Sequence, residues 1–153
     1  MKKVVASLLG LALVAGLSGG AMAQEVNKVP NKTVTINGIT YTDEREPNDT
    51  EATADSYTEG NVIRGELPQG DFQDYFTFTA KNSGTYRMKM QPAVSSNTYE
   101  LWIKKPGSSY FKKVQSQADV TLENGQVYIL RVLPVYQNYT YSQAYTASVS
   151  FVQ

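Results

Sequence analysis

Five carboxylates crowd into one short stretch near the start of the chain, DEREPNDTE at residues 43–51. In an extended segment, Glu44, Glu46 and Asn48 project from one face, because side chains two residues apart lie on the same side. Asp49 follows where the chain is expected to turn. Like charges this close repel one another unless a cation lies between them. The stretch therefore presents oxygen donors that fit a bound cation.

A second acidic pair, Asp71 and Asp74, lies just before and at the start of the strand-like segment DYFTFTA. The chain has no cysteine and no histidine, so the usual nitrogen and sulfur ligands of zinc and copper are missing. Calcium takes about 6 to 8 oxygen ligands, whereas magnesium retains several waters and uses few carboxylates. If the two acidic segments lie side by side, calcium is the cation that they fit best.

The same residues also fit a purely structural role. Asn48 and Glu51 have the spacing of a helix capping box, and Asp49 would favour a helix N-terminus through the helix dipole. Asp71 is also an ordinary turn residue. The D-x-D-x-D-G pattern of an EF-hand loop does not occur. The pattern alone leaves a cation site and a short capped helix through TEATADS open as alternatives.

Catalysis is a third interpretation of these acids. Without histidine or cysteine, Ser-His-Asp and Cys-His catalysis is excluded. Paired carboxylates can hydrolyse glycosides, and Glu46, Asp71 or Asp74 could supply such a pair. A cluster this dense fits a cation better, and a small sandwich offers little cleft. We therefore predict that the protein is not an enzyme.

The elements that must position these acids are predicted to be short β-strands. TVTINGITYT alternates around Asn37 and Gly38, which is the strongest short hairpin signal. DYFTFTA and GTYRMKM alternate apolar and polar residues and are expected to pair as an antiparallel hairpin, while the nearly continuous QVYILRVL predicts a central strand. Roughly eight such strands predict an all-β fold, an antiparallel sandwich or barrel with at most one short helix.

The first residues predict a secretion signal. A basic start, an apolar run and a small-x-small motif are typical of a signal peptide, with cleavage expected after Ala23. The apolar run is shorter than the roughly 20 residues of a membrane-spanning helix. Removal of residues 1–23 from 153 leaves 130, enough for one domain. We expect a lead-in and hairpin over residues 24–42, the sandwich over residues 43–153, and a secreted protein, periplasmic if the source is Gram-negative.

The net charge of the mature chain limits the classes of partner that we expect. Loss of Lys2 and Lys3 with the signal leaves 12 basic and 14 acidic residues, a net charge of −2 (12 − 14). A nucleic-acid-binding protein would be expected to use a basic face, which this balance does not favour. We therefore expect no nucleic acid and, after signal cleavage, no membrane among the partners.

The order of the motifs resembles a known family. EREPNDTEATAD, VIRGEL, DFQDYFTFTA, GTYRMKM, YELWIKKPG, GQVYILRV and YTASVSF look like the bacterial pre-peptidase C-terminal (PPC) domain family, whose relatives include collagen-binding domains of clostridial collagenases. The resemblance covers about residues 43–152. It implies a jelly-roll-like β-sandwich that binds one calcium ion or a closely spaced pair. Carried over residue by residue, it implies as ligands Glu44, Glu46, Asn48, Asp49, Asp71 and Asp74.

The same resemblance suggests two functions. Domains of this family commonly follow a secreted peptidase catalytic domain, which this sequence does not contain, so we expect the chain to act in trans. It would then be a binding module for an extracellular protein or polymer, collagen-like or at a cell surface. Alternatively, it would be a structural or regulatory partner, or an inhibitor, of a secreted peptidase.

Tyrosines near the C-terminus are candidates for contacting such a partner. Tyr136, Tyr139 and Tyr141 would suit an exposed recognition surface, because tyrosine offers a large apolar body with a polar tip at low entropic cost. Strand propensity alone also explains them, with Tyr145 in the core. Trp102 alternates with apolar neighbours and is expected on the outer face of its strand.

Overall fold

The computed structural model describes residues 31–92, 99–114, 117–135 and 144–153, and their regular structure consists of strands. Within these ranges no helix is long and apolar enough to cross a membrane. The predicted signal peptide, residues 1–23, lies outside them. The strands are β1 (Thr33–Ile36), β2 (Ile39–Asp43), β3 (Asp55–Ser56), β4 (Val62–Glu66), β5 (Asp74–Thr79), β6 (Gly84–Pro92), β7 (Tyr99–Lys104), β8 (Lys112–Val114), β9 (Gln117–Leu122), β10 (Val127–Pro134) and β11 (Ala144–Phe151).

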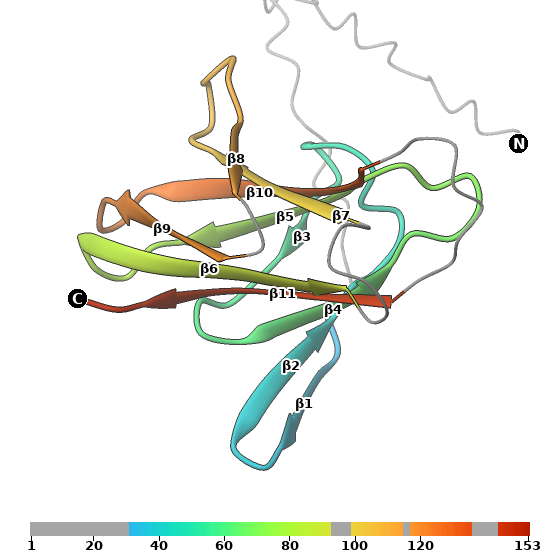
Figure 1. The fold of residues 1–153 in the computed structure, drawn as a ribbon, viewed down its shortest axis with the longest axis horizontal. Helices are drawn as coiled ribbons and strands as arrows, with labels where there is room; N and C mark the ends of the chain where they lie inside the picture. Colours follow the sequence, from blue (N-terminus) through green and yellow to red (C-terminus); the bar gives the residue numbers. More distant parts are fainter. Residues whose placement is uncertain (1–30, 93–98, 115–116, 136–143) are drawn as a thin grey trace, which may run out of the picture.

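The strands form two sheets that pack into a β-sandwich (Figure 1). One sheet has the order β1-β2-β4-β11-β6-β9 and the other the order β3-β5-β10-β7-β8. Pairing is antiparallel except for β2 with β4 and β3 with β5, which are parallel. These parallel pairs arise because the chain crosses to the opposite sheet and returns between their two strands. The predicted all-β sandwich is confirmed, with mixed sheets and eleven described strands instead of about eight.

The core lies between the sheets and follows the predicted alternation. Phe76 and Phe78 of β5 are 1% and 3% exposed, and Tyr86 and Met88 of β6 are fully buried. Strand β10 runs between β5 and β7, as its nearly continuous apolar sequence predicts. Tyr145 of β11 is 1% exposed, which confirms its place in the core.

The predicted hairpin of DYFTFTA with GTYRMKM is wrong. These segments are β5 and β6, and they belong to different sheets. Strand β5 pairs with β10 and β3, whereas β6 pairs with β11 and β9. The turn residues between them specify a reversal of the chain, but here the reversal crosses from one layer of the sandwich to the other.

No helix forms through TEATADS. Residues 50–53 make a single turn, closed by the Thr53 N–H donating to the Thr50 carbonyl oxygen at 3.1 Å, and β3 follows. Asp55 and Glu51 make tertiary contacts in place of the helix-capping interactions that the sequence pattern suggested. Asp55 is fully buried and accepts a hydrogen bond from the Arg45 N–H at 2.6 Å, while Glu51 forms an ion pair with Lys104.

The predicted hairpin at Asn37 and Gly38 is confirmed. Both residues have positive φ, 49° and 79°, as the tight turn between β1 and β2 requires. The hairpin projects from the sandwich, and β2 joins the six-stranded sheet beside β4 (Figure 1). Strand β2 ends at Asp43 and β5 begins at Asp74 in the other sheet. The acidic stretch therefore leaves one sheet and meets the start of a strand in the other.

Candidate metal centre

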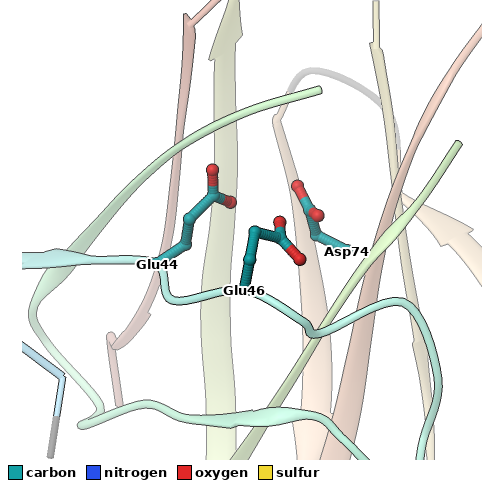
Figure 2. Close-up of side chains that lie close together, drawn as sticks. All are labelled: Glu44, Glu46 and Asp74. Atoms are coloured by element: carbon teal, nitrogen blue, oxygen red, sulfur yellow. The ribbon is translucent and has the colours of Figure 1, made fainter. Parts of the chain in front are cut away.

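The predicted acids gather in two adjoining groups. Glu44, Glu46 and Asp74 each offer a carboxylate oxygen, and these oxygens lie within 4.8 Å of one another. Glu46, Asp49 and Asp71 form a second group with the same spacing. Figure 2 shows Glu44 and Glu46 extending from the loop after β2 toward Asp74 on β5. Glu46 belongs to both groups, so the five acids form one continuous cluster.

Backbone contacts with β4 position Glu44. Its N–H donates to the Arg64 carbonyl oxygen at 2.9 Å, and its carboxylate Oε1 accepts from the Glu66 N–H at 2.6 Å. Asp43 forms an ion pair with Arg64 at 2.6 Å. The first residues of the acidic stretch are thus held along the edge of β4.

Asn48 ties the loop to β5. It is fully buried, its carbonyl oxygen accepts from the Tyr75 N–H at 2.8 Å, and its own N–H donates to Glu46 Oε2 at 3.0 Å. The Glu46–Pro47 peptide bond between these residues is cis. A buried Asn held from both sides by main-chain contacts keeps its side chain at the centre of the cluster.

One end of the Asn48 side-chain amide faces carboxylates, and its other end faces only hydrogen-bond donors. The terminal atom at the carboxylate end lies 2.9 Å from Asp74 Oδ1 and 3.1 and 3.2 Å from the two carboxylate oxygens of Glu46. If that atom is the amide nitrogen, it donates hydrogen bonds to both carboxylates. If it is the amide oxygen, several acceptors face one another, and a cation between them removes the repulsion. With the nitrogen toward the carboxylates, both ends of the amide are satisfied without a cation, and Asn48 could be a ligand only with its oxygen turned toward the cluster.

Tyr145 joins two of the carboxylates from β11. Its hydroxyl lies 2.5 Å from Asp74 Oδ2 and 3.0 Å from Glu44 Oε2. A phenol has one proton to donate, so it satisfies one carboxylate and leaves the other to be neutralised by a proton or a cation. Burial raises the pKa of Tyr145 well above its ordinary value, which keeps its hydroxyl protonated.

Desolvation shifts the acids toward their neutral forms. Burial, followed by the charge of Glu44, raises the pKa of Asp74 from 3.8 to about 10. Burial also raises the pKa of Glu44 from 4.5 to about 7. Asp71 behaves likewise: burial, together with the charges of Glu46 and Asp49, raises its pKa from 3.8 to about 7. In the absence of a cation, protons must therefore hold this cluster together near neutral pH.

One carboxylate oxygen has no partner. Asp71 Oδ1 accepts from the Gln73 N–H at 3.3 Å, whereas Asp71 Oδ2 is buried without a hydrogen bond. A buried, unsatisfied carboxylate oxygen costs free energy unless an ion or a water meets it. This atom fits a hard cation with oxygen ligands.

Glycine at position 65 allows the close approach. Gly65 lies opposite Tyr145 in the pairing of β4 with β11. A Cβ at this position would lie 2.1 Å from Glu44 Oε2 and 2.5 Å from the Tyr145 hydroxyl oxygen. Any side chain here would displace both groups from the cluster.

Three residues of the site were not predicted from the sequence. Tyr145 was placed in the core without a role for its hydroxyl, and Asp55, whose carboxylate fixes the Arg45 backbone, was read as part of a helix. Gly65 carried a usable signal, because a glycine inside a strand often marks a close approach. The roles of Tyr145 and Asp55 depend on contacts with residues distant in sequence, so no local sequence pattern indicates them.

The structure describes Trp102 but not the three tyrosines that were predicted to contact a partner. Tyr136, Tyr139 and Tyr141 lie outside the described residues. Trp102 is half-buried on the outer face of β7, as expected, and its indole N–H donates to Glu100 Oε2 at 3.0 Å.

Comparison with known proteins identifies the fold. No family model matches the chain, and no curated protein matches it. The pre-peptidase C-terminal domain of a collagenase from Bacillus anthracis has a TM-score of 0.50 and 17% identity, over 63% of this chain and 93% of that one. The periplasmic g-type lysozyme inhibitors PliG of Salmonella Typhimurium and Aeromonas hydrophila have lower TM-scores, 0.39 and 0.40, at 16% and 17% identity, each over 61% of this chain and 96% of theirs. The collagenase domain supports a PPC-like fold for this chain.

The raised pKa values predict that the metal-free fold weakens as pH rises. Glu44, Asp71 and Asp74 bind protons more tightly in the folded than in the unfolded chain, so their stabilisation is full below their unfolded pKa values and is lost as pH rises through the folded ones. Solvent screening reduces the share of the partly exposed Asp71. Denaturant unfolding in a chelator should give a loss on the order of 3 kcal/mol between about pH 5 and about pH 8.

The variant Asp74→Asn is the control for this pH dependence. It removes the carboxyl with the largest shift, so its unfolding free energy should fall less steeply over the same pH range. A wild-type stability that is flat or that rises with pH in the chelator would contradict the described burial of the cluster.

Gly65→Ala should disrupt the cluster without removing the strand. The added Cβ forces Glu44 and Tyr145 apart, and we expect a destabilisation of about 1–3 kcal/mol, typical of overpacking. A double-mutant cycle with Glu44→Ala isolates the cause, because the substitution should cost less once the Glu44 carboxylate is gone. Equal costs in both backgrounds, measured by denaturant unfolding, would disprove the close approach.

Proposed function

We propose that the protein is a secreted, calcium-stabilised binding module without catalytic activity, which recognises an extracellular protein or polymer. The observation that carries the calcium proposal is the cluster of five carboxylates from two segments of the chain, whose mutual repulsion a cation would remove. The unpartnered Asp71 Oδ2 supports it independently. The residues that would hold the metal are Glu44, Glu46, Asn48, Asp49, Asp71 and Asp74.

The donor set favours calcium over other metals. All six side chains offer oxygen, which suits hard cations, and their number approaches a full calcium shell where magnesium would keep several waters. Two groups that share Glu46 have room for one ion or for a pair bridged by that carboxylate. The bound charge would replace the protons on Glu44 and Asp74 and would tie the loop after β2 to the start of β5.

The local surroundings of the acids favour a non-catalytic role. Glu44 is engaged with the Glu66 N–H and Tyr145, and Asp74 is fully buried. A general acid or base has to reach its substrate directly or through one water. The acids with the most strongly raised pKa values are therefore the ones that the fold encloses.

The fold supports the partner class only indirectly. One neighbour of known structure is a domain of a collagenase, which motivates tests with collagen and other extracellular polymers. Retention on collagen, cell-wall or host-matrix preparations would identify the polymer. Co-purification with a secreted peptidase would favour the alternative role as a structural or regulatory partner, or an inhibitor, acting in trans.

Calcium should stabilise the wild type and should reverse the order of stability of wild type and Asp74→Asn. Keeping Asp74 protonated at neutral pH costs free energy, so the asparagine variant should be about 2 kcal/mol more stable in a chelator. At free calcium of about 100 times Kd, the wild type should gain roughly 2.7 kcal/mol and the variant little. Thermal or denaturant unfolding in both conditions measures this crossover.

A surface acid provides the matched control. Asp119→Asn removes a carboxylate that pairs with Arg87 on the other end of the six-stranded sheet, and it should leave the calcium response intact. Unchanged unfolding of the wild type in calcium, with no calcium in the purified protein by elemental analysis, would rule out the proposed role of the cluster.

A further inference from the structure

A row of aromatic and cationic side chains crosses the outer face of the five-stranded sheet. Tyr75 of β5, Arg131 of β10, Trp102 of β7 and Lys113 of β8 lie directly opposite one another in the strand register. Their neighbours along each strand, such as Phe76 and Leu101, point into the core. The row therefore lies on the outer side of the sheet and takes no part in the metal cluster, although Tyr75 itself is covered and only 7% exposed.

Arg131 is held between two aromatic rings. Its guanidinium carbon lies 5.6 Å from the centre of the Trp102 ring and 4.4 Å from that of Phe111, which comes from the connection between β7 and β8. Phe111 also packs edge-on against Tyr75, with ring centres 6.3 Å apart. Two such contacts fix the plane of the guanidinium group and leave its donor edge as the part that can bind an anion.

The neighbouring cations have carboxylate partners, whereas Arg131 has none among the residues that the structure describes. Lys113 pairs with Glu100, and Lys104 pairs with Glu51 at 2.5 Å. The contacts of Arg131 with the described residues are the two ring contacts, and its Nε is buried without a hydrogen-bond partner. A half-buried guanidinium without an anion is unusual, because such a group is expected to pair with a carboxylate or phosphate.

We propose that this face, defined by Trp102, Phe111 and Arg131, docks an acidic segment of a partner protein, one carboxylate of which pairs with Arg131. Arginine, tryptophan and tyrosine are the residue types that dominate the energetics of protein interfaces, especially near the centre of a patch. A planar guanidinium matches a carboxylate in a two-bond geometry. The rim carries Tyr110, which is 84% exposed beside Phe111. This inference rests on the proposed role as a binding module and is independent of its calcium site.

The protein carries its own reporter for this docking. Trp102 is the one tryptophan of the whole chain, so intrinsic tryptophan fluorescence reads this face alone. We suggest titrating the full chain with a glutamate-rich peptide and with the same peptide in which every glutamate is replaced by glutamine. The glutamate peptide should change Trp102 fluorescence in a saturable way that weakens at high salt, and the glutamine peptide should not.

Arg131→Gln tests the assigned contact. It should weaken binding of the glutamate peptide by about tenfold or more, while the melting temperature stays the same or rises because an unpaired charge is removed. The matched control is Arg87→Gln, which removes a guanidinium that pairs with Asp119 on the other sheet and should leave the affinity within about twofold.

Three outcomes would overturn the proposal, and the first two concern the peptides. One is equal affinity for the glutamate and glutamine peptides, or no binding of either. The other is a glutamate-peptide affinity that Arg131→Gln leaves unchanged. A sulfated polysaccharide that binds through Arg131 when the peptide does not would equally reject a protein partner. Because retention on an extracellular polymer is measured separately, a failed peptide titration would leave the binding-module proposal standing and remove this docking site.

Discussion

Carboxylates enclosed at one end of the sandwich repel one another. The placement of the residues around them depends on how this repulsion is compensated. Glu44 leaves the six-stranded sheet and Asp74 opens a strand of the five-stranded sheet, and their oxygens lie within 4.8 Å together with one from Glu46. Burial strengthens this repulsion because water no longer screens it. Protons, hydrogen-bond donors or a cation must therefore compensate for the charge before the loop can close onto β5.

The surrounding residues make sense as responses to this constraint. Tyr145 on β11 supplies a hydroxyl donor. Gly65 has no side chain, which leaves room for this hydroxyl and Glu44 to approach each other. Asn48 supplies an amide whose nitrogen, when it faces the cluster, donates to Glu46 and Asp74. Because these groups come from both sheets, whatever neutralises the cluster also fastens the two layers to each other. A bound calcium ion would do so without the cost of holding protons at neutral pH.

The residues that gather at the site are easier to predict from the sequence than the pairing of the strands is. Alternation fixes which residues face the core, and the Asn37–Gly38 turn is a local signal that the structure confirms. The acids that gather at the site were identified from residue type and from the family resemblance. Strand partners were not predictable, since the reversal between β5 and β6 has ordinary turn residues but crosses between the layers. The roles of Tyr145 and Gly65 depend on contacts across strands that are distant in sequence.

If a cation takes the place of protons in this cluster, its binding must release those protons. Calorimetric titration of calcium into the metal-free protein at about pH 6, repeated in buffers of different ionisation enthalpy, counts the protons released on binding. The raised pKa values of Glu44, Asp71 and Asp74 predict saturable binding with release of about one or more protons for each protein molecule. Absence of a binding heat, or binding whose heat is the same in every buffer, would contradict the account.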